Sequence, residues 1–228
     1  MPRVLILDGS LHRDVYRPDE GWRQWLGATA IDSVHLPSGG SVPDLGGYTH
    51  VIVTGSEASI VAPEPWFEVE VRVVRQAAER GLCILGSCFG HQMLALALSG
   101  PRYVGRCATP EMGWIPVRWL GSDPLCDELP NPSWMFASHF DEVPAPLPPP
   151  WIALAESAGC AVQAMRYGER PIWGIQAHPE ITPEEARTLM QGFLRLAPQH
   201  AALVGSALAA APRDDGVIGE IIRRFLLA

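Results

Sequence analysis

The segment from residue 50 to residue 85 constrains the fold more than any other part of this sequence. Two short, largely apolar runs, at residues 50–54 and 82–85, flank a stretch over residues 66–80 whose apolar side chains have helical spacing. A similar apolar run lies at residues 4–7. Runs that are apolar at nearly every position are typical of strands buried on both faces. The segment therefore predicts a β–α–β unit in a parallel sheet that helices cover on both sides.

The middle of the chain has a different pattern. A second apolar helix is expected after Gln92, ending at Gly100 and Pro101. Beyond it, Gly, Pro, Asn and Asp separate five short strand-like segments, at residues 114–119, 134–137, 151–155, 161–167 and 172–177. The predicted fold class is therefore α/β, with a mostly parallel open sheet flanked by helices (flavodoxin-like) and a smaller antiparallel β part from the middle of the chain.

The last quarter of the chain is predicted to be helical. Thr182 followed by Pro183 and two glutamates has the composition of a helix start, with a capping residue, a proline at the first helical position and negative charge in the first turn. The proline-rich residues 143–150 are interpreted as a stiff loop within one domain. We expect one domain over residues 1–196. Residues 197–228 would form a helical extension, ending in an amphipathic helix at 217–227, packed on the domain or on a partner.

Composition excludes several classes of function. The formal net charge of the 228 residues is -8, which disfavours a nucleic-acid partner. The chain has no lysine, so it has neither a P-loop lysine nor a Schiff-base lysine. Its five cysteines have no C-x-x-C spacing, so no metal site is expected, and we predict no cofactor. The apolar run at residues 4–7 is too short for a secretory signal, and no stretch could span a membrane, so we expect a cytoplasmic protein.

Cys88 stands where an apolar strand is predicted to turn sharply into a helix. Gly86 precedes it by two residues and Gly90 follows it by two, as a tight turn between closely packed backbones requires. A side chain on such a turn projects clear of the sheet, and the positive end of the helix dipole favours a thiolate there. Most cysteines are buried core residues. The turn instead predicts that Cys88 is a nucleophile.

A second pattern ends the strand predicted at residues 172–177. His178 follows the strand directly, Pro179 restricts its backbone to extended angles, and Glu180 comes two residues after the histidine. Glu180 is placed to accept a hydrogen bond from one ring nitrogen of His178, which leaves the other nitrogen to act as a base toward a thiol. Such a pair alone is commonly a salt bridge, so it indicates a catalytic site only in combination with Cys88.

Together these residues carry a family resemblance. The run from Gly86 to Gln92, Gly-Ser-Cys-Phe-Gly-His-Gln, resembles the G-x-C-x-G-x-Q signature of the triad-type (class I) glutamine amidotransferases, and His178-Pro179-Glu180 resembles their H-P-E. The likeness extends in element order over residues 4–190. Stand-alone members similar to the glutaminase domain of GMP synthetase resemble the chain most.

The resemblance also implies further site residues. Residues 138–141, Ser-His-Phe-Asp, are similar to the S-H-G-D of the GMP synthetase type, with Phe140 in place of the glycine. The implied oxyanion donors are the backbone N–H groups of Gly55 and Phe89. The implied substrate-binding and oxyanion residues are Gly55, Phe89, Gln92, Ser138, His139 and Phe140.

The implied reaction is hydrolysis of the side-chain amide of glutamine, or of a γ-glutamyl amide, through a cysteine thioester. Ammonia would pass to a separate synthetase subunit, because the chain has no second domain large enough to be a synthetase. Two alternatives stay open: a γ-glutamyl peptide hydrolase independent of any synthetase, and a non-catalytic binding or regulatory homologue. A cysteine-elbow chaperone or protease is disfavoured by the His-Pro-Glu at a strand end. Expected partners are the small-molecule substrate, a second copy of the chain in a homodimer, and a synthetase subunit.

Overall fold

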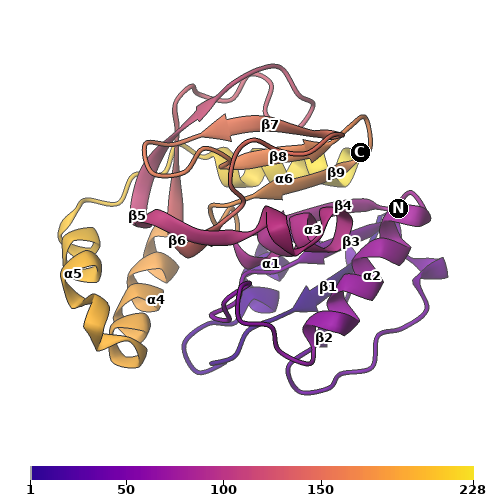
Figure 1. The fold of residues 1–228 in the computed structure, drawn as a ribbon, viewed down its shortest axis with the longest axis horizontal. Helices are drawn as coiled ribbons and strands as arrows, with labels where there is room; N and C mark the ends of the chain where they lie inside the picture. Colours follow the sequence, from indigo (N-terminus) through magenta and orange to yellow (C-terminus); the bar gives the residue numbers. More distant parts are fainter. Residues whose placement is uncertain (1) are drawn as a thin grey trace.

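The structure, a computed structural model that describes residues 2–228, contains one mixed sheet with helices on both faces (Figure 1). Its elements in chain order are β1 (Arg3–Asp8), α1 (Pro18–Leu26), β2 (Ala30–His35), η1 (Leu45–Gly47), β3 (His50–Val53), α2 (Phe67–Glu79), β4 (Cys83–Ser87), α3 (Phe89–Ser99), η2 (Pro101–Tyr103), β5 (Gly105–Trp119), β6 (Ser133–Glu142), β7 (Trp151–Glu156), β8 (Ala164–Tyr167), β9 (Ile172–Ile175), α4 (Pro183–Leu196), η3 (Pro198–His200), α5 (Ala201–Ala209) and α6 (Val217–Leu227). The strand order is β2-β1-β3-β4-β9-β8-β7-β5-β6.

One end of this sheet is parallel. Strands β2, β1, β3, β4 and β9 run in the same direction. Residues on one face of β1 and β3 pack with α2 and α3, and residues on the other face pack with α1 and α6. Strands with helices on both faces have no solvated side, which explains their nearly continuous apolar sequence. The predicted α/β class, and the β–α–β unit formed by β3, α2 and β4, are confirmed.

The other end of the sheet is antiparallel. Strands β8, β7, β5 and β6 continue the sheet from β9, each antiparallel to its neighbour. This is the antiparallel part predicted from the middle of the chain, although β5 and β6 are longer than the segments predicted at 114–119 and 134–137. The register of this pair shifts between Arg106 and Glu111, and that irregularity obscures the period of two in the sequence. Conversely, β8 and β9 are shorter than the predicted segments 161–167 and 172–177.

Two elements near the N-terminus were not predicted. Helix α1 begins at Pro18 and buries Trp22 and Leu26 on one face. Two apolar residues at helical spacing are too few to identify a helix from the sequence. Strand β2 lies at the edge of the sheet, and only one of its residues is buried. Edge strands carry mixed polar and apolar side chains, so β2 lacks the apolar run that identified its neighbours.

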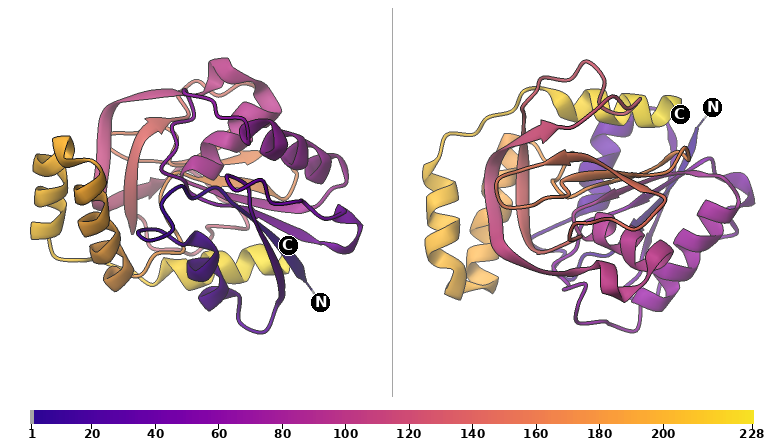
Figure 2. Two further views of the ribbon diagram at one scale, coloured as in Figure 1. Left: turned by 90° about the horizontal axis from the view of Figure 1, so that it is seen from below. Right: turned by 45° about the horizontal axis from the view of Figure 1, so that its top comes forward.

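The C-terminal helices lie in two places (Figures 1 and 2). Helices α4 and α5 form a pair beside β5 and β6, and α6 returns to pack across the sheet. The start of α4 is fixed by the capping box of Thr182 and Glu185, as the sequence predicted. Ile221, Ile222 and Phe225 of α6 are fully buried in the core that also contains β1 and β3. No helix within residues 2–228 has both the length and the apolar character needed to cross a lipid bilayer.

Candidate active site

Cys88 occupies a strained turn between β4 and α3. Its backbone has φ of 50° and ψ of -107°, in the region that favours glycine. The flanking glycines are sterically required, because a Cβ on Gly86 would lie 2.5 Å from the carbonyl oxygen of Gly90, and a Cβ on Gly90 would lie 2.0 Å from that of Val53. A strained residue held in place by its surroundings is typical of functional sites. The sharp turn expected from the sequence is present.

Two backbone N–H groups near Cys88 are available to a ligand. Phe89 is the first residue of α3, where an amide has no partner within its own helix, and Gly55 follows β3 in the neighbouring loop. Within residues 2–228, neither amide donates to a protein acceptor. A Cβ on Gly55 would lie 2.8 Å from Cε1 of His178, so only glycine fits at this position.

His178 and Glu180 form a buried pair just beyond β9. The Nδ1 atom of His178 lies 2.9 Å from Oε1 of Glu180, and the exposed fractions of the two residues are 4% and 0%. The backbone N–H of His178 donates to the carbonyl oxygen of Phe136 at 2.8 Å, which fixes the turn to β6. Because a carboxylate only accepts, Nδ1 is the donor, and Nε2 is left to face a reacting group.

The charges around His178 favour its imidazolium form. Burial by itself lowers the pKa of this histidine, but the negative charges of the Cys88 thiolate and of Glu180 outweigh burial and raise the pKa to about 10. An imidazolium next to a thiolate is the ion pair used by cysteine nucleophiles. The site can therefore hold a proton on His178 at neutral pH, ready for a leaving group.

Tyr16 is a member of the site that the sequence did not indicate. Its hydroxyl donates to Oε1 of Glu180 at 2.8 Å and lies 3.4 Å from Nδ1 of His178. Burial, followed by the charge of Glu180, raises the pKa of Tyr16 well above its usual value, so the hydroxyl stays protonated as a donor. Tyr16 is 164 positions from Glu180 in the chain, in a loop without periodic pattern, so no local signal could have identified it.

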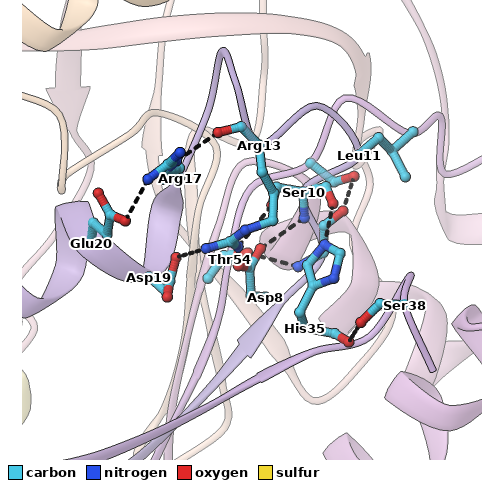
Figure 3. Close-up of polar contacts among 12 residues, drawn as sticks. Asp8, Ser10, Leu11, Arg13, Arg17, Asp19, Glu20, His35, Ser38 and Thr54 are labelled. Atoms are coloured by element: carbon cyan, nitrogen blue, oxygen red, sulfur yellow. Dashed lines mark hydrogen bonds and ion pairs between the residues drawn. The ribbon is translucent and has the colours of Figure 1, made fainter. Parts of the chain in front are cut away.

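The loop that carries Tyr16 is fixed by polar contacts (Figure 3). Arg13 pairs with Asp8, at the end of β1, and lies 2.9 Å from Asp19 in α1. Asp8 also accepts from the backbone N–H of Ser10, and His35 contacts the carbonyl oxygen of Ser10 at 2.7 Å. Asp8 therefore holds the loop in place through these contacts.

Glu57 ties the same loop to the loop that follows β3. Its two carboxylate oxygens accept from the backbone N–H groups of Leu11, at 2.8 Å, and His12, at 3.3 Å. From the other side, α4 packs closely on Val15, since a Cβ on Gly192 would lie 2.3 Å from Cγ1 of that valine. Tyr16 is thus held against Glu180 by contacts on several sides.

A cavity of about 300 Å³ lies over Cys88. Its size is at the lower end of the range for small-molecule sites. The sequence-predicted residues that line it are Cys88, Phe89, Gln92, Ser138, His139, Phe140 and His178. Glu180 and Gly55 are not among the lining residues. Glu180 contacts Nδ1 of His178, and Gly55 lies next to Cε1 of the same ring. Most of the predicted site is therefore brought together around one cavity.

The predicted binding residues differ in how their side chains are used. Gln92 donates to the carbonyl oxygen of Asp141 at 2.7 Å, and the imidazole of His139 lies 3.2 Å from Glu111. These two side chains therefore hold the residues of the cavity wall in place rather than leaving their polar atoms free for a ligand. Ser138 contributes its carbonyl oxygen, 3.6 Å from Sγ of Cys88, and Phe140 points its ring toward α4 and η3.

Gln176 is a second member of the site that the sequence did not indicate. Its Nε2 donates to Sγ of Cys88 at 3.8 Å, and its Oε1 accepts from Gln92 at 3.2 Å. The position just past β9, two residues before His178, is the only sequence signal that could have pointed to it.

Comparison with known proteins agrees with this geometry. Residues 42–196 match the sequence model of the family described as Glutamine amidotransferase class-I. The chain belongs to this family. Gly55, Cys88, His178 and Glu180 lie inside the matched range, whereas Tyr16 and His200 lie outside it. The family assignment confirms the resemblance carried by the motifs around Cys88 and His178.

Named relatives extend the comparison. The chain is 34% identical over 126 residues to a subunit of the glutamine-hydrolyzing GMP synthase of Pyrococcus abyssi, a match that covers 55% of this chain and 65% of that protein. It is 39% identical over 121 residues to the corresponding subunit of Methanosarcina barkeri, covering 52% and 61% respectively. The matches thus span less than two thirds of these relatives. The crystal structure of a glutamine amidotransferase from Thermotoga maritima shares the fold, with a TM-score of 0.80 and 22% identity over 99% of this chain and 96% of that one.

Proposed function

We propose that the chain hydrolyses the side-chain amide of glutamine or of a γ-glutamyl amide, with Cys88 as nucleophile, His178 as acid and base, and Glu180 as the residue that orients the histidine. The observation that carries this proposal is the buried His178–Glu180 pair, 2.9 Å apart, beside a cysteine on a strained turn at a helix N-terminus. Cys88 and His178 line the same cavity, which supports the assignment of these three residues as a nucleophilic triad.

In the first step, the Cys88 thiolate attacks the amide carbon and the carbonyl oxygen becomes an oxyanion. The N–H groups of Gly55 and Phe89 are proposed to stabilise that oxyanion, and each such donor contributes about 3 kcal/mol to transition-state stabilisation. The carbon–sulfur bond forms, the carbon–nitrogen bond breaks, and the His178 imidazolium gives its proton to the departing nitrogen.

In the second step, neutral His178 takes a proton from water, and the hydroxide formed attacks the thioester. The carbon–sulfur bond breaks, the carboxylate product leaves, and the thiolate–imidazolium pair is restored. Glu180 keeps its hydrogen bond to Nδ1 throughout, so that Nε2 alone exchanges protons with the reacting groups. The products are glutamate and ammonia, or glutamate and an amine.

Release of ammonia or amine by the purified chain tests the proposal. Glutamine and a panel of γ-glutamyl amides should be turned over by the wild type and not by Cys88→Ala. Cys83→Ala is the matched control, since Cys83 lies at the other end of β4. Turnover that survives Cys88→Ala, or none with any amide, would contradict the proposal.

The destination of the ammonia is a second part of the proposal. The relatives from Pyrococcus abyssi and Methanosarcina barkeri are named as one subunit of a GMP synthase, which supports the view that the partner is a separate synthetase subunit. If glutamine hydrolysis by the chain rises severalfold when an extract of the source cells is added, a partner is present in that extract. Equal rates with and without the extract would favour a hydrolase that acts alone.

A further inference from the structure

One side of the cavity over Cys88 is formed by three rings, Phe140, Phe193 and His200, which we call the aromatic wall. The ring centroids of Phe140 and His200 are 4.3 Å apart, those of Phe140 and Phe193 are 5.8 Å apart, and those of Phe193 and His200 are 6.1 Å apart. All three residues line the cavity and are only partly buried. Ring faces left open beside a nucleophile offer a surface for another apolar group.

The wall is built from three separate segments of the chain, β6, α4 and η3. Phe140 stands on β6, in the position where the similar S-H-G-D motif has a glycine. Phe193 lies on α4, one turn after Leu189, which also lines the cavity. His200 ends η3, outside the residues 42–196 that match the family. Phe140 and Phe193 lie within the matched residues and His200 lies outside them, so the complete wall depends on a residue beyond the matched range.

The rest of the cavity has a different chemistry. Glu57 and Arg106 line it together with Asp141, and Arg106 lies 3.0 Å from Asp141. Charged groups of both signs suit the ammonium and carboxylate of a γ-glutamyl group. A substrate that occupies the whole cavity would need those charges and an apolar part as well.

The position of His178 indicates which part of the substrate meets the wall. His178 must contact the leaving nitrogen to protonate it, and α4 begins at Pro183, just after the His178–Glu180 pair. Leu189 and Phe193 of that helix line the same cavity as His178. Because these residues share one cavity with His178, a substituent on the leaving nitrogen has room to reach α4 and the aromatic wall.

We propose that the aromatic wall binds the amine portion of γ-glutamyl amides whose amine carries an aromatic or bulky apolar group. This inference rests on the proposed function and narrows its substrate class. The reaction consumes one water: the amide carbon–nitrogen bond breaks, the amine leaves with the proton from His178, and hydrolysis of the thioester gives glutamate. Plain glutamine has only hydrogens on that nitrogen and leaves the wall uncovered.

Two substrates that differ only in the phenyl group test the inference. γ-Glutamyl-phenethylamide and γ-glutamyl-ethylamide both have a primary alkylamine as leaving group. The wild type is expected to favour the phenethylamide by about tenfold in kcat/KM, as a ring contact of ~1.4 kcal/mol would give. In Phe193→Leu, which keeps an apolar side chain and removes the ring, the ratio should fall toward one. Leu196→Ala is the matched control, because Leu196 is an exposed residue of the same helix; it should keep the wild-type ratio.

Binding to the Cys88→Ala variant gives a readout without turnover. By calorimetry, that variant should bind the phenethylamide about tenfold more tightly than the ethylamide, and addition of Phe193→Leu should abolish the difference. If the wild type hydrolyses glutamine or the ethylamide with the same kcat/KM as the phenethylamide, the inference is wrong and the proposed function stands. If no amide is hydrolysed, the proposed function fails, and the inference fails with it.

Discussion

The two sides of the cavity are held in different ways. On one side, Cys88, His178 and Glu180 are at most 5% exposed and are fixed by hydrogen bonds and by glycines that no other residue could replace. On the other side, the rings of Phe140 and Phe193 are only partly buried and are held by apolar contacts with each other, with His200 and with a neighbouring apolar cluster. Bond-making groups require a fixed geometry, whereas a recognition surface can vary. Substitutions on the first side should therefore abolish turnover, and those on the second should change which substrate is preferred.

The largest effect after loss of the nucleophile is expected for His178→Ala. Without the imidazolium, neither the leaving nitrogen nor the attacking water has a proton partner, so kcat should fall by about 10³-fold or more. Steady-state assay of amine release would measure this loss, with His12→Ala, an exposed histidine of the loop before α1, as the control. A loss smaller than about tenfold would place the base elsewhere.

Glu180→Gln should have the next largest effect, about 10²-fold in kcat, because a glutamine amide can donate to His178 and select the wrong tautomer. It should also change the pH dependence. The pKa of His178 is raised to about 10, so the wild type keeps its imidazolium up to that pH. Removing the charge of Glu180 lowers that pKa, so the alkaline limb of the kcat profile should move to lower pH. An unmoved limb would show that the charge of Glu180 does not contribute to the raised pKa of His178, leaving Cys88 as its source.

Tyr16→Phe removes only the hydroxyl that donates to Glu180 at 2.8 Å. Loss of one hydrogen bond to a charged group should lower kcat by about tenfold with little change in KM, since the hydroxyl acts through Glu180 rather than on the substrate. Tyr48→Phe, which removes a hydroxyl that bonds to Asp32 far from Cys88, is the matched control. A change confined to KM would instead make Tyr16 a substrate-binding residue.

The sequence predicted the parts of this site that local geometry controls. Cys88 could be identified because a strand that turns directly into a helix requires Gly86 and Gly90 beside it. Phe140 could be noted as a departure from a motif, but nothing near it indicated its contact with His200, 60 positions away. Tyr16 was missed for the same reason, since tertiary packing alone brings it to Glu180. Edge strand β2 and the irregular pair β5–β6 likewise lack a regular pattern in the sequence.

The smallest effect is expected for Thr182→Ala, at the start of the helix that carries Phe193. Loss of the capping box should lower the free energy of unfolding by about 1 kcal/mol, measured by urea denaturation. Thr188→Ala, at an exposed position inside the same helix, is the control and should be nearly neutral. If Thr182→Ala abolished turnover without lowering stability, the start of α4 would belong to the catalytic side of the cavity rather than to the support of the aromatic wall.

Covalent labelling shows whether Cys88 is the nucleophile of an amide-hydrolysing site. The folded chain is incubated with a chloroketone analogue of glutamine, and the adducts are located by mass spectrometry. We expect one adduct, on Cys88, with none on Cys83, Cys107, Cys126 or Cys160, and a large loss of labelling in His178→Ala. Absence of any adduct on Cys88, or equal labelling of the other cysteines, would contradict this role for Cys88.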